Sequence, residues 1–159
     1  MRAMLSMRAK YGLKALLALA RAGDGATLRI ADIAAGEKIP KKFLESILLD
    51  LRKSGLLSSR IGVGGGYSLA RPADLITMGE AVRLLDGPLA PIACVSQTAY
   101  ERCDDCDDEA GCALRLVMKD VRDRIASILD NTTLREALQT APRTATRNGA
   151  AARPRGKKP

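Results

Sequence analysis

Residues 39–57 read IPKKFLESILLDLRKSGLL, and this stretch decides the fold. Its apolar side chains recur every three or four residues, which is the spacing of one buried helix face. Pro40 stands where the first turn of a helix tolerates a missing backbone N–H, and Gly55 ends the pattern. We therefore predict a helix whose buried face consists of Phe43, Leu44, Ile47, Leu48 and Leu51.

Two further helices are predicted before this stretch. Residues 7–22 are rich in Ala, Leu and Lys, which favour a helix, and Gly23 with Gly25 ends that segment. A second, shorter helix is predicted to start at Thr27 and to end at Gly36. Two short helices joined by a tight turn, the second with a Lys-rich start, are typical of a helix-turn-helix. The buried face of the shorter helix is expected to consist of Leu28, Ile30, Ile33 and Ala34.

A glycine-rich segment follows these helices. Residues 60–69 read RIGVGGGYSL, with four glycines in five positions, and Arg60 and Arg71 flank the segment. Such a sequence can form a sharp hairpin whose backbone approaches another surface closely. A nucleotide phosphate loop is the alternative, but its lysine pattern and a surrounding βαβ unit are absent from the sequence. We predict a β-hairpin wing, which makes residues 1–75 a winged helix-turn-helix domain.

The charged side chains fall into three blocks. Residues 1–75 carry 13 basic and 6 acidic side chains, residues 76–141 carry 7 and 12, and residues 142–159 carry 6 and none. A basic N-terminal block indicates a polyanionic partner, and a winged helix-turn-helix inserts its third helix into the major groove of DNA. The last block has no apolar side chain larger than Ala, so we expect residues 142–159 to be a disordered basic tail.

The predicted third helix leaves a polar face for double-stranded DNA. We expect contacts with phosphates or base edges from Lys41, Lys42 and Arg60. Glu45 is a candidate for accepting a hydrogen bond from a cytosine amino group. A solvated helix face is the alternative for each lysine, and some winged helices bind only proteins. The predicted DNA-binding residues are Lys41, Lys42, Glu45, Ser46, Arg60, Gly64 and Gly65.

Composition excludes several classes of protein. The chain contains no histidine, which rules out a Ser-His-Asp triad, a Cys-His nucleophile pair and His-ligated metal sites. Lys10, Lys14 and Arg21 interrupt the best apolar stretch, so nothing approaches the roughly 20 residues of a membrane span. We expect a cytoplasmic protein that is not an enzyme and does not associate with membranes.

Two capping boxes are predicted in residues 76–141. Thr77 and Glu80 have the spacing of a capping box, and the short helix that they open is expected to end at Gly87. Thr133 and Glu136 form the second box, before a last helix that we expect to fold back on the core.

A long helix is predicted between these two boxes, starting at Cys112 or Leu114. Its length, about 17 residues or roughly 25 Å, exceeds what a small winged domain needs to cover. Pairing of two copies explains this length, so we predict a homodimer that reads a palindromic operator. The apolar stripe of this helix consists of Leu114, Val117, Met118, Val121, Ile125, Ile128 and Leu129.

Four cysteines in the spacing C-x8-C-x2-C-x5-C precede the long helix, among six acidic residues. A structural disulfide is disfavoured in the cytoplasm, and neighbouring carboxylates raise a thiol pKa, which disfavours a catalytic thiolate. A bound cation reverses that effect, so we predict a metal site, either an iron–sulfur cluster or, less favoured by this spacing, zinc. For Cys94 the alternative is a small buried apolar residue. The predicted ligands are Cys94, Cys103, Cys106 and Cys112.

Five segments of the chain resemble the Rrf2 family of bacterial winged-helix regulators and follow one another in the order typical of that family. The resemblance covers residues 4–138. These segments are YGLKAL from Tyr11, IPKKFLESIL from Ile39, LRKSGLL ending at Leu57, RIGVGGGY from Arg60 and NTTLREAL from Asn131. The resemblance implies a homodimeric DNA-binding transcriptional regulator of the repressor type, with a mainly α fold, a small β-hairpin wing and a long dimerisation helix.

The resemblance also implies a cysteine-ligated iron–sulfur cluster, of the 2Fe-2S or the 4Fe-4S type. Cys94, Cys106 and Cys112 resemble the trio of cluster-binding members, and Cys103 is additional. Arg115 stands at the position where one member of the family has a histidine ligand, and arginine cannot replace it. Other relatives use an acidic residue of the first helix as a ligand, but residues 1–20 contain no Asp or Glu. The resemblance therefore implies either that Cys103 is the fourth ligand or that one iron has an open coordination position. The alternatives within the same fold are a zinc-stabilised regulator and a metal-free thiol–disulfide switch that links Cys103 to Cys106.

Overall fold

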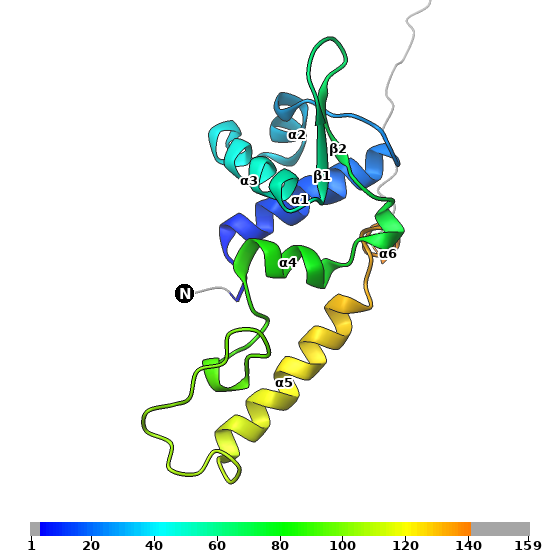
Figure 1. Cartoon of the computed structure of the whole chain (residues 1–159). Helices are drawn as coiled ribbons and strands as arrows, with labels where there is room; N and C mark the ends of the chain where they lie inside the picture. Colours follow the sequence, from blue (N-terminus) through cyan, green and yellow to red (C-terminus); the bar gives the residue numbers. More distant parts are fainter. Residues whose placement is uncertain (1–3, 141–159) are drawn as a thin grey trace, which may run out of the picture.

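The computed structural model describes residues 4–140, which form helices and one two-stranded antiparallel hairpin (Figure 1). This arrangement confirms the predicted fold class, and the tail predicted over residues 142–159 lies outside the described residues. The elements in chain order are α1 (Met7–Ala22), α2 (Ile30–Glu37), α3 (Lys41–Lys53), β1 (Leu57–Arg60), β2 (Gly66–Leu69), η1 (Ala73–Leu75), α4 (Met78–Asp86), η2 (Ala93–Val95), α5 (Ala113–Asp130) and α6 (Leu134–Thr140), where η marks a 3-10 turn.

Helix α1 lies at the centre of the hydrophobic core and packs against α3, α4 and α6. A glycine makes part of this packing possible. Gly12 on α1 has no side chain, and a Cβ there would collide with Leu85 of α4 and crowd Ile47 of α3. The three helices therefore approach one another more closely than a larger residue at this position would allow.

Helix α3 has the buried face that the sequence predicts, with one exception. Leu44, Ile47, Leu48 and Leu51 are buried, whereas 37% of Phe43 is exposed. Phe43 lies at the edge of the apolar face, where its ring meets Tyr11 of α1 edge to face at a centroid distance of 5.7 Å.

The prediction for the second helix was wrong at both ends. Helix α2 begins at Ile30 after Arg29, contains Gly36, and ends where Lys38 adopts a left-handed conformation at φ 55°. Leu28 lies outside the helix because its backbone pairs with Tyr67 of the hairpin through two hydrogen bonds of 2.9 and 2.8 Å. A partner 39 positions away in the chain leaves no trace in the local spacing of apolar residues.

The hairpin pairs Leu57 with Leu69 at its base and Arg60 with Gly66 near its tip. Gly66 has φ 150°, and a Cβ there would collide with the carbonyl of Leu28. Only glycine suits this position, because the backbone of the wing must pass directly against the segment before α2.

The two predicted capping boxes differ. Thr133 and Glu136 form a complete box, in which the Thr133 N–H donates to the Glu136 carboxylate at 2.9 Å and the Glu136 N–H donates to the Thr133 hydroxyl at 3.2 Å. The Glu80 N–H donates to the Thr77 hydroxyl at 3.1 Å, but the Glu80 carboxylate accepts from Arg71 instead of returning to Thr77. The first box is therefore only half formed.

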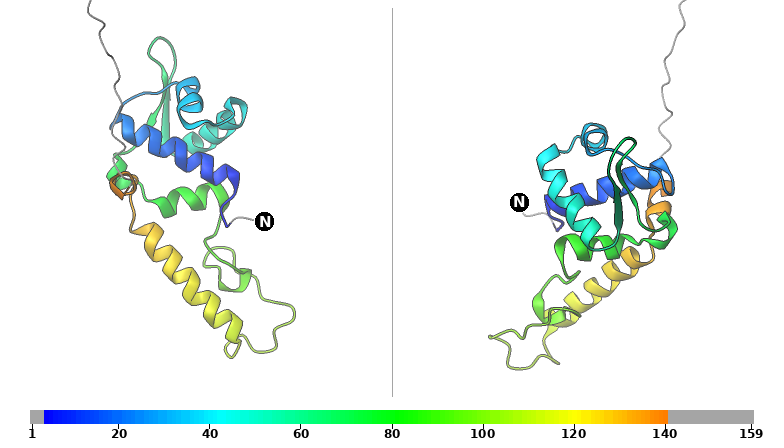
Figure 2. Two further views of the ribbon diagram at one scale, coloured as in Figure 1. Left: turned by 180° about the vertical axis from the view of Figure 1, so that it is seen from behind. Right: turned by 45° about the horizontal axis from the view of Figure 1, so that its top comes forward.

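Helix α5 extends from the base of the winged unit, and the two further views in Figure 2 place it at the end of the molecule opposite the wing. It has 18 residues, none of them buried. The segment after α5 returns to the body, where the Met78 N–H donates to the Thr132 carbonyl at 2.8 Å and the Leu134 N–H donates to the Ile76 carbonyl at 2.9 Å. The fully buried Leu134 then fixes α6 in the core, as the sequence predicts. Within residues 4–140, no helix has the length and apolar character needed to cross a membrane.

Candidate functional site

An open groove of about 470 Å³ lies between the start of α2, helix α3 and the hairpin. It brings together three of the predicted DNA-binding residues, Lys41, Glu45 and Arg60. Arg52 on α3 ties the helix to the hairpin by donating to the Ser59 hydroxyl at 3.2 Å. The lining residues are Arg29, Ile30, Ala31, Lys41, Glu45, Arg52, Ser59, Arg60, Ile61, Gly66 and Tyr67.

The ion pairs of the N-terminal block leave the groove positively charged. Several cations of this block are neutralised away from it, in the pairs Arg8–Asp50, Lys14–Glu37, Arg21–Glu37 and Arg71–Glu80. By contrast, Arg29, Lys41 and Arg60 form no ion pair with any residue between 4 and 140. Unpaired cations with a single acid, Glu45, suit contact with a phosphate backbone and one base edge.

The other predicted DNA-binding residues lie near the groove but do not line it. Lys42 and Ser46 are exposed on α3, and the Ser46 hydroxyl donates to the Phe43 carbonyl at 2.9 Å. Gly64 and Gly65 lie in the tip of the wing between the two strands. Arg29, which the sequence analysis did not single out, also lines the groove and immediately precedes α2.

The four cysteines lie along the loop between α4 and α5. Cys94 is buried in η2, whereas Cys103, Cys106 and Cys112 are half-buried, and all four are free thiols. Cys94, Val95 and Ser96 are the buried residues of this loop. The burial of Cys94 agrees with the alternative prediction, in which Cys94 is a small apolar residue of the interior. Burial alone does not decide whether Cys94 binds a metal.

Two of the thiols have raised pKa values, and a neighbouring cysteine is among the causes for each. A hydrogen-bonding interaction with Cys94, followed by desolvation and nearby negative charge, raises the pKa of the Cys103 thiol to about 11. Desolvation and then the neighbouring Cys112 raise the pKa of Cys106, with further contributions from Glu109 and Asp105. Both thiols are therefore protonated near neutral pH, which opposes a role as nucleophiles.

The predicted four-cysteine ligand set is not assembled in this conformation. Among residues 4–140, no group of three or more Cys, Asp or Glu side chains is close enough to hold a metal ion. The donor chemistry nevertheless suits iron or zinc, because four thiols lie within one loop. Metal binding at these residues requires the thiols to approach one another.

A recognition helix, a wing and a positively charged groove between them define the class of winged-helix DNA-binding regulators. The sequence model of the Rrf2 family, described as an iron-dependent transcriptional regulator, matches residues 5–140. The chain belongs to the Rrf2 family.

Individual relatives support this assignment. An rrf2-like HTH-type transcriptional regulator of Rhodobacter capsulatus is 45% identical over 138 residues, covering 85% of this chain and 92% of the relative. The HTH-type transcriptional regulator CymR of Bacillus subtilis is 32% identical, covering 83% and 87%. The HTH-type transcriptional regulator IscR of Escherichia coli is 31% identical, covering 83% and 78%.

Solved structures agree with the sequence comparisons. The structure of CymR, described as the global cysteine regulator of B. subtilis, superimposes with a TM-score of 0.73 at 29% identity and covers 89% of this chain and all of that one. IscR of T. potens superimposes with a TM-score of 0.70 at 26% identity, covering 91% and 93%. The family and these relatives are transcriptional regulators, so this chain is a transcriptional regulator and not an enzyme.

Proposed function

We propose that this regulator is a cytoplasmic homodimer that represses transcription from palindromic operators, and that an iron–sulfur cluster held by Cys94, Cys103, Cys106 and Cys112 controls its affinity for DNA. The observation that carries the proposal is the confinement of all four cysteines to one loop that runs directly into α5, in a chain without histidine. The description of the family as iron-dependent supports the same assignment.

The groove supports the proposed DNA contacts. Lys41 and Arg60 lie on opposite walls, on α3 and on the hairpin, so helix and wing together can follow the phosphates on both sides of a major groove. Glu45 lies between them on α3 and can accept from a cytosine amino group. Lys42, Ser46, Gly64 and Gly65 are exposed or at the wing tip, where they complete the proposed surface.

Helix α5 supports the proposed homodimer. Leu114, Val117 and Ile128 belong to its apolar stripe and are 61%, 58% and 66% exposed. At 1.5 Å per residue the helix is about 27 Å long, which suits antiparallel or crossed packing against its own copy. Two-fold symmetry then presents two recognition helices to one duplex, about one DNA turn (~34 Å) or more apart, and makes the operator palindromic.

The loop residues indicate how ligation can influence DNA binding. The thiols of the metal-free loop would have to lose their protons to bind iron, and a bound cluster would supply a reactive, removable link among the four cysteines. Because Cys112 immediately precedes Ala113, the first residue of α5, rearrangement of the loop acts directly on the proposed dimer helix.

The cofactor is tested by anaerobic purification followed by iron, sulfide and zinc analysis. We expect a coloured protein with iron and acid-labile sulfide, and loss of both in Cys106→Ser or Cys112→Ser. Zinc without iron overturns the cluster and leaves a zinc-stabilised regulator. A genomic footprint identifies the operator, and we expect its affinity to change when the cluster is removed under anaerobic conditions.

The DNA-binding surface is tested separately by titrating duplex at several salt concentrations. Lys41→Ala is expected to weaken binding to all sequences and to reduce the slope of log affinity against log salt by about 1, since one phosphate contact is lost. Lys119→Ala, an exposed lysine on α5, is the matched control and is expected to change neither quantity. Equal effects of the two variants contradict the proposed surface.

A second candidate is a metal-free thiol switch, which the presence of four free thiols in one loop favours. The Cys106 backbone N–H donates to the Cys103 carbonyl at 3.4 Å, so the two residues of the link that the sequence suggests are neighbours. An oxidised form of Staphylococcus aureus CymR is among the similar structures. Oxidation of the metal-free protein with diamide, followed by peptide mapping, identifies the linked pairs, and an unchanged affinity for DNA after oxidation contradicts this candidate.

A further inference from the structure

We propose that Arg115 and Arg122 of α5 are positioning residues that hold Cys94 against this helix, so that Cys94 is a fixed thiol towards which the other cysteines move. This inference rests on the proposed role of the cysteine loop. The proposal assigns a function to two arginines that are not among the proposed DNA-binding or metal-binding residues.

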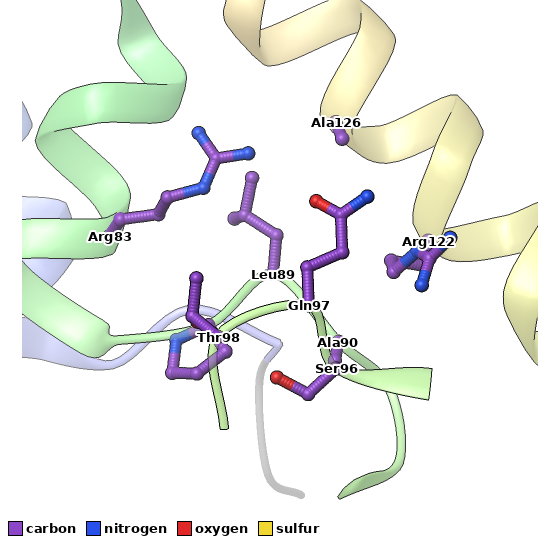
Figure 3. A pocket seen from close by; sticks show the side chains of 9 residues that line it. Arg83, Leu89, Ala90, Ser96, Gln97, Thr98, Arg122 and Ala126 are labelled. Carbon is purple, nitrogen blue, oxygen red and sulfur yellow. The ribbon is translucent and has the colours of Figure 1, made fainter. Parts of the chain in front are cut away.

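The two arginines lie on the same face of α5, seven residues or two turns apart. The Arg115 Nε donates to the Cys94 carbonyl at 3.3 Å, and the Arg122 Nη1 donates to the Val95 carbonyl. Adjacent carbonyls of the η2 turn are therefore both bound by guanidinium groups from one helix. In Figure 3, Arg122 lies on α5 beside the loop that carries Ser96 and Gln97.

The burial of Arg122 shows that this contact is part of the packed structure. Only 13% of its side chain is exposed, and Asp123 balances its charge by accepting from its Nε at 2.8 Å. The neighbouring cavity, lined by Arg83, Leu89, Gln97 and Arg122, has a volume of about 20 Å³, which is enough for one water but not for a metabolite (Figure 3). The arginine therefore serves the loop and not a ligand pocket.

Two of the four thiols are thus attached to α5. Cys94 is held by the arginines, and Cys112 is attached because it is the residue directly before the helix. Cys103 and Cys106 are half-buried and lie among mostly exposed residues of the loop. Ligation or oxidation that joins them to Cys94 or Cys112 therefore acts on a residue that is attached to α5.

A path from α5 to the DNA-binding surface exists in the packing. Arg83 of α4 forms two hydrogen bonds with Asp130 at the end of α5, of 2.5 and 2.9 Å, and Gly79 leaves the space that this pair occupies. Helix α4 packs on α1 through Leu85, and α1 packs on α3. A displacement of α5 thereby reaches the recognition helix through packed elements.

Rates of thiol alkylation test the arginines without any metal. In reduced, metal-free wild-type protein treated with iodoacetamide, we expect Cys94 to react at least tenfold more slowly than Cys103. Arg122→Gln and Arg115→Gln are expected to raise the Cys94 rate at least tenfold and to leave the Cys103 rate within twofold. The conservative variant Arg122→Lys, which keeps the charge and one donor, is expected to restore part of the protection.

Arg124→Gln is the matched control, since Arg124 lies on the same helix, is 77% exposed and pairs only with Asp120 one turn away. It should change neither rate. Far-ultraviolet circular dichroism and the melting temperature identify any Gln variant that is merely unfolded. If a Gln variant is unfolded, the Cys94 alkylation rate of Arg122→Lys tests the proposal instead. A wild-type Cys94 that reacts as fast as Cys103, or an unchanged Cys94 rate in both Gln variants, overturns the proposal.

The second part of the experiment measures DNA affinity with and without iron. Arg122→Gln is expected to retain the iron content of the wild-type protein but to lose most of the difference in DNA affinity between the two forms. Retention of the full difference overturns the proposed transmission. Because alkylation is measured on metal-free protein, it decides the role of the arginines even where the wild-type protein takes up no iron, a result that overturns only the proposed cofactor.

Discussion

The winged unit and helix α5 are folded by different means. Every buried apolar residue of the described chain except Cys94 and Val95 lies between Ala9 and Leu85 or is Leu134, whereas α5 buries none of its 18 residues. The winged unit thus carries its own core, whereas Leu114, Val117 and Ile128 of the α5 stripe remain exposed in the single chain. The DNA-binding half is therefore packed within one chain, and the proposed dimer would cover the exposed part of α5.

The largest expected effect comes from comparing a buried residue of the winged unit with an exposed residue of α5. Leu48→Ala removes a fully buried side chain of α3 and is expected to lower the free energy of unfolding by about 2–5 kcal/mol. Leu116→Ala, at a position of α5 that is 53% exposed and outside the apolar stripe, is expected to change it by less than about 0.5 kcal/mol. Urea denaturation at one protein concentration measures both. Comparable losses would show that α5 belongs to the same core as the winged unit.

A smaller effect is expected on self-association. Ile128→Asp places a charge in the exposed stripe of α5 and is expected to weaken dimerisation at least tenfold, or about 1.4 kcal/mol, because the charge must lose its water on pairing. Leu116→Asp introduces the same charge on another side of the helix and is expected to have little effect. Sedimentation velocity over a range of concentrations compares them. A dimer that tolerates Ile128→Asp uses a different surface.

The smallest effect concerns the junction between the two regions and depends on pH. Hydrogen bonds and the charge of Arg83 lower the pKa of Asp130 below its usual 3.8, against the opposing effect of desolvation. The pair therefore stabilises the folded state above pH 3.8, and this contribution is lost as the pH falls through the lowered pKa. Both side chains are about a third or more exposed, so the contribution is at most about 1 kcal/mol.

Asp130→Asn is expected to remove this acid-dependent contribution while leaving the winged unit folded. Thermal melts between pH 2.5 and pH 7 are the measurement, with Asp120→Asn on the exposed face of α5 as the control. If the wild-type protein and Asp130→Asn lose stability in parallel below pH 3.8, the pair contributes nothing to the attachment of α5.

Local patterns in the sequence predict the elements that are stabilised by near neighbours. The spacing of Leu44, Ile47 and Leu48 predicts α3 and its buried face, and the Thr133 and Glu136 box predicts the start of α6, because all of these interactions lie within one or two helical turns. The glycines of residues 62–66 predict the wing for the same reason, since they permit the sharp turn between its strands.

Features that depend on distant partners escape such patterns. The β-bridge between Leu28 and Tyr67 shifts the start of α2, and Arg71 takes the carboxylate that Glu80 would otherwise return to Thr77. The arginine contacts to Cys94 and Val95 cross 21 and 27 positions of sequence. The residue types of the candidate sites could be read from the sequence, whereas the contacts of Arg115 and Arg122 with the cysteine loop required the three-dimensional structure.

The two backbone hydrogen bonds that join Ile76 with Leu134 and Met78 with Thr132 hold together the two ends of the segment formed by α4, the cysteine loop and α5. A protease that cuts the exposed loop is therefore expected to leave a nicked but intact molecule, since α6 keeps the second fragment docked. A change in the length of this loop is likewise expected to leave the groove between α3 and the hairpin intact.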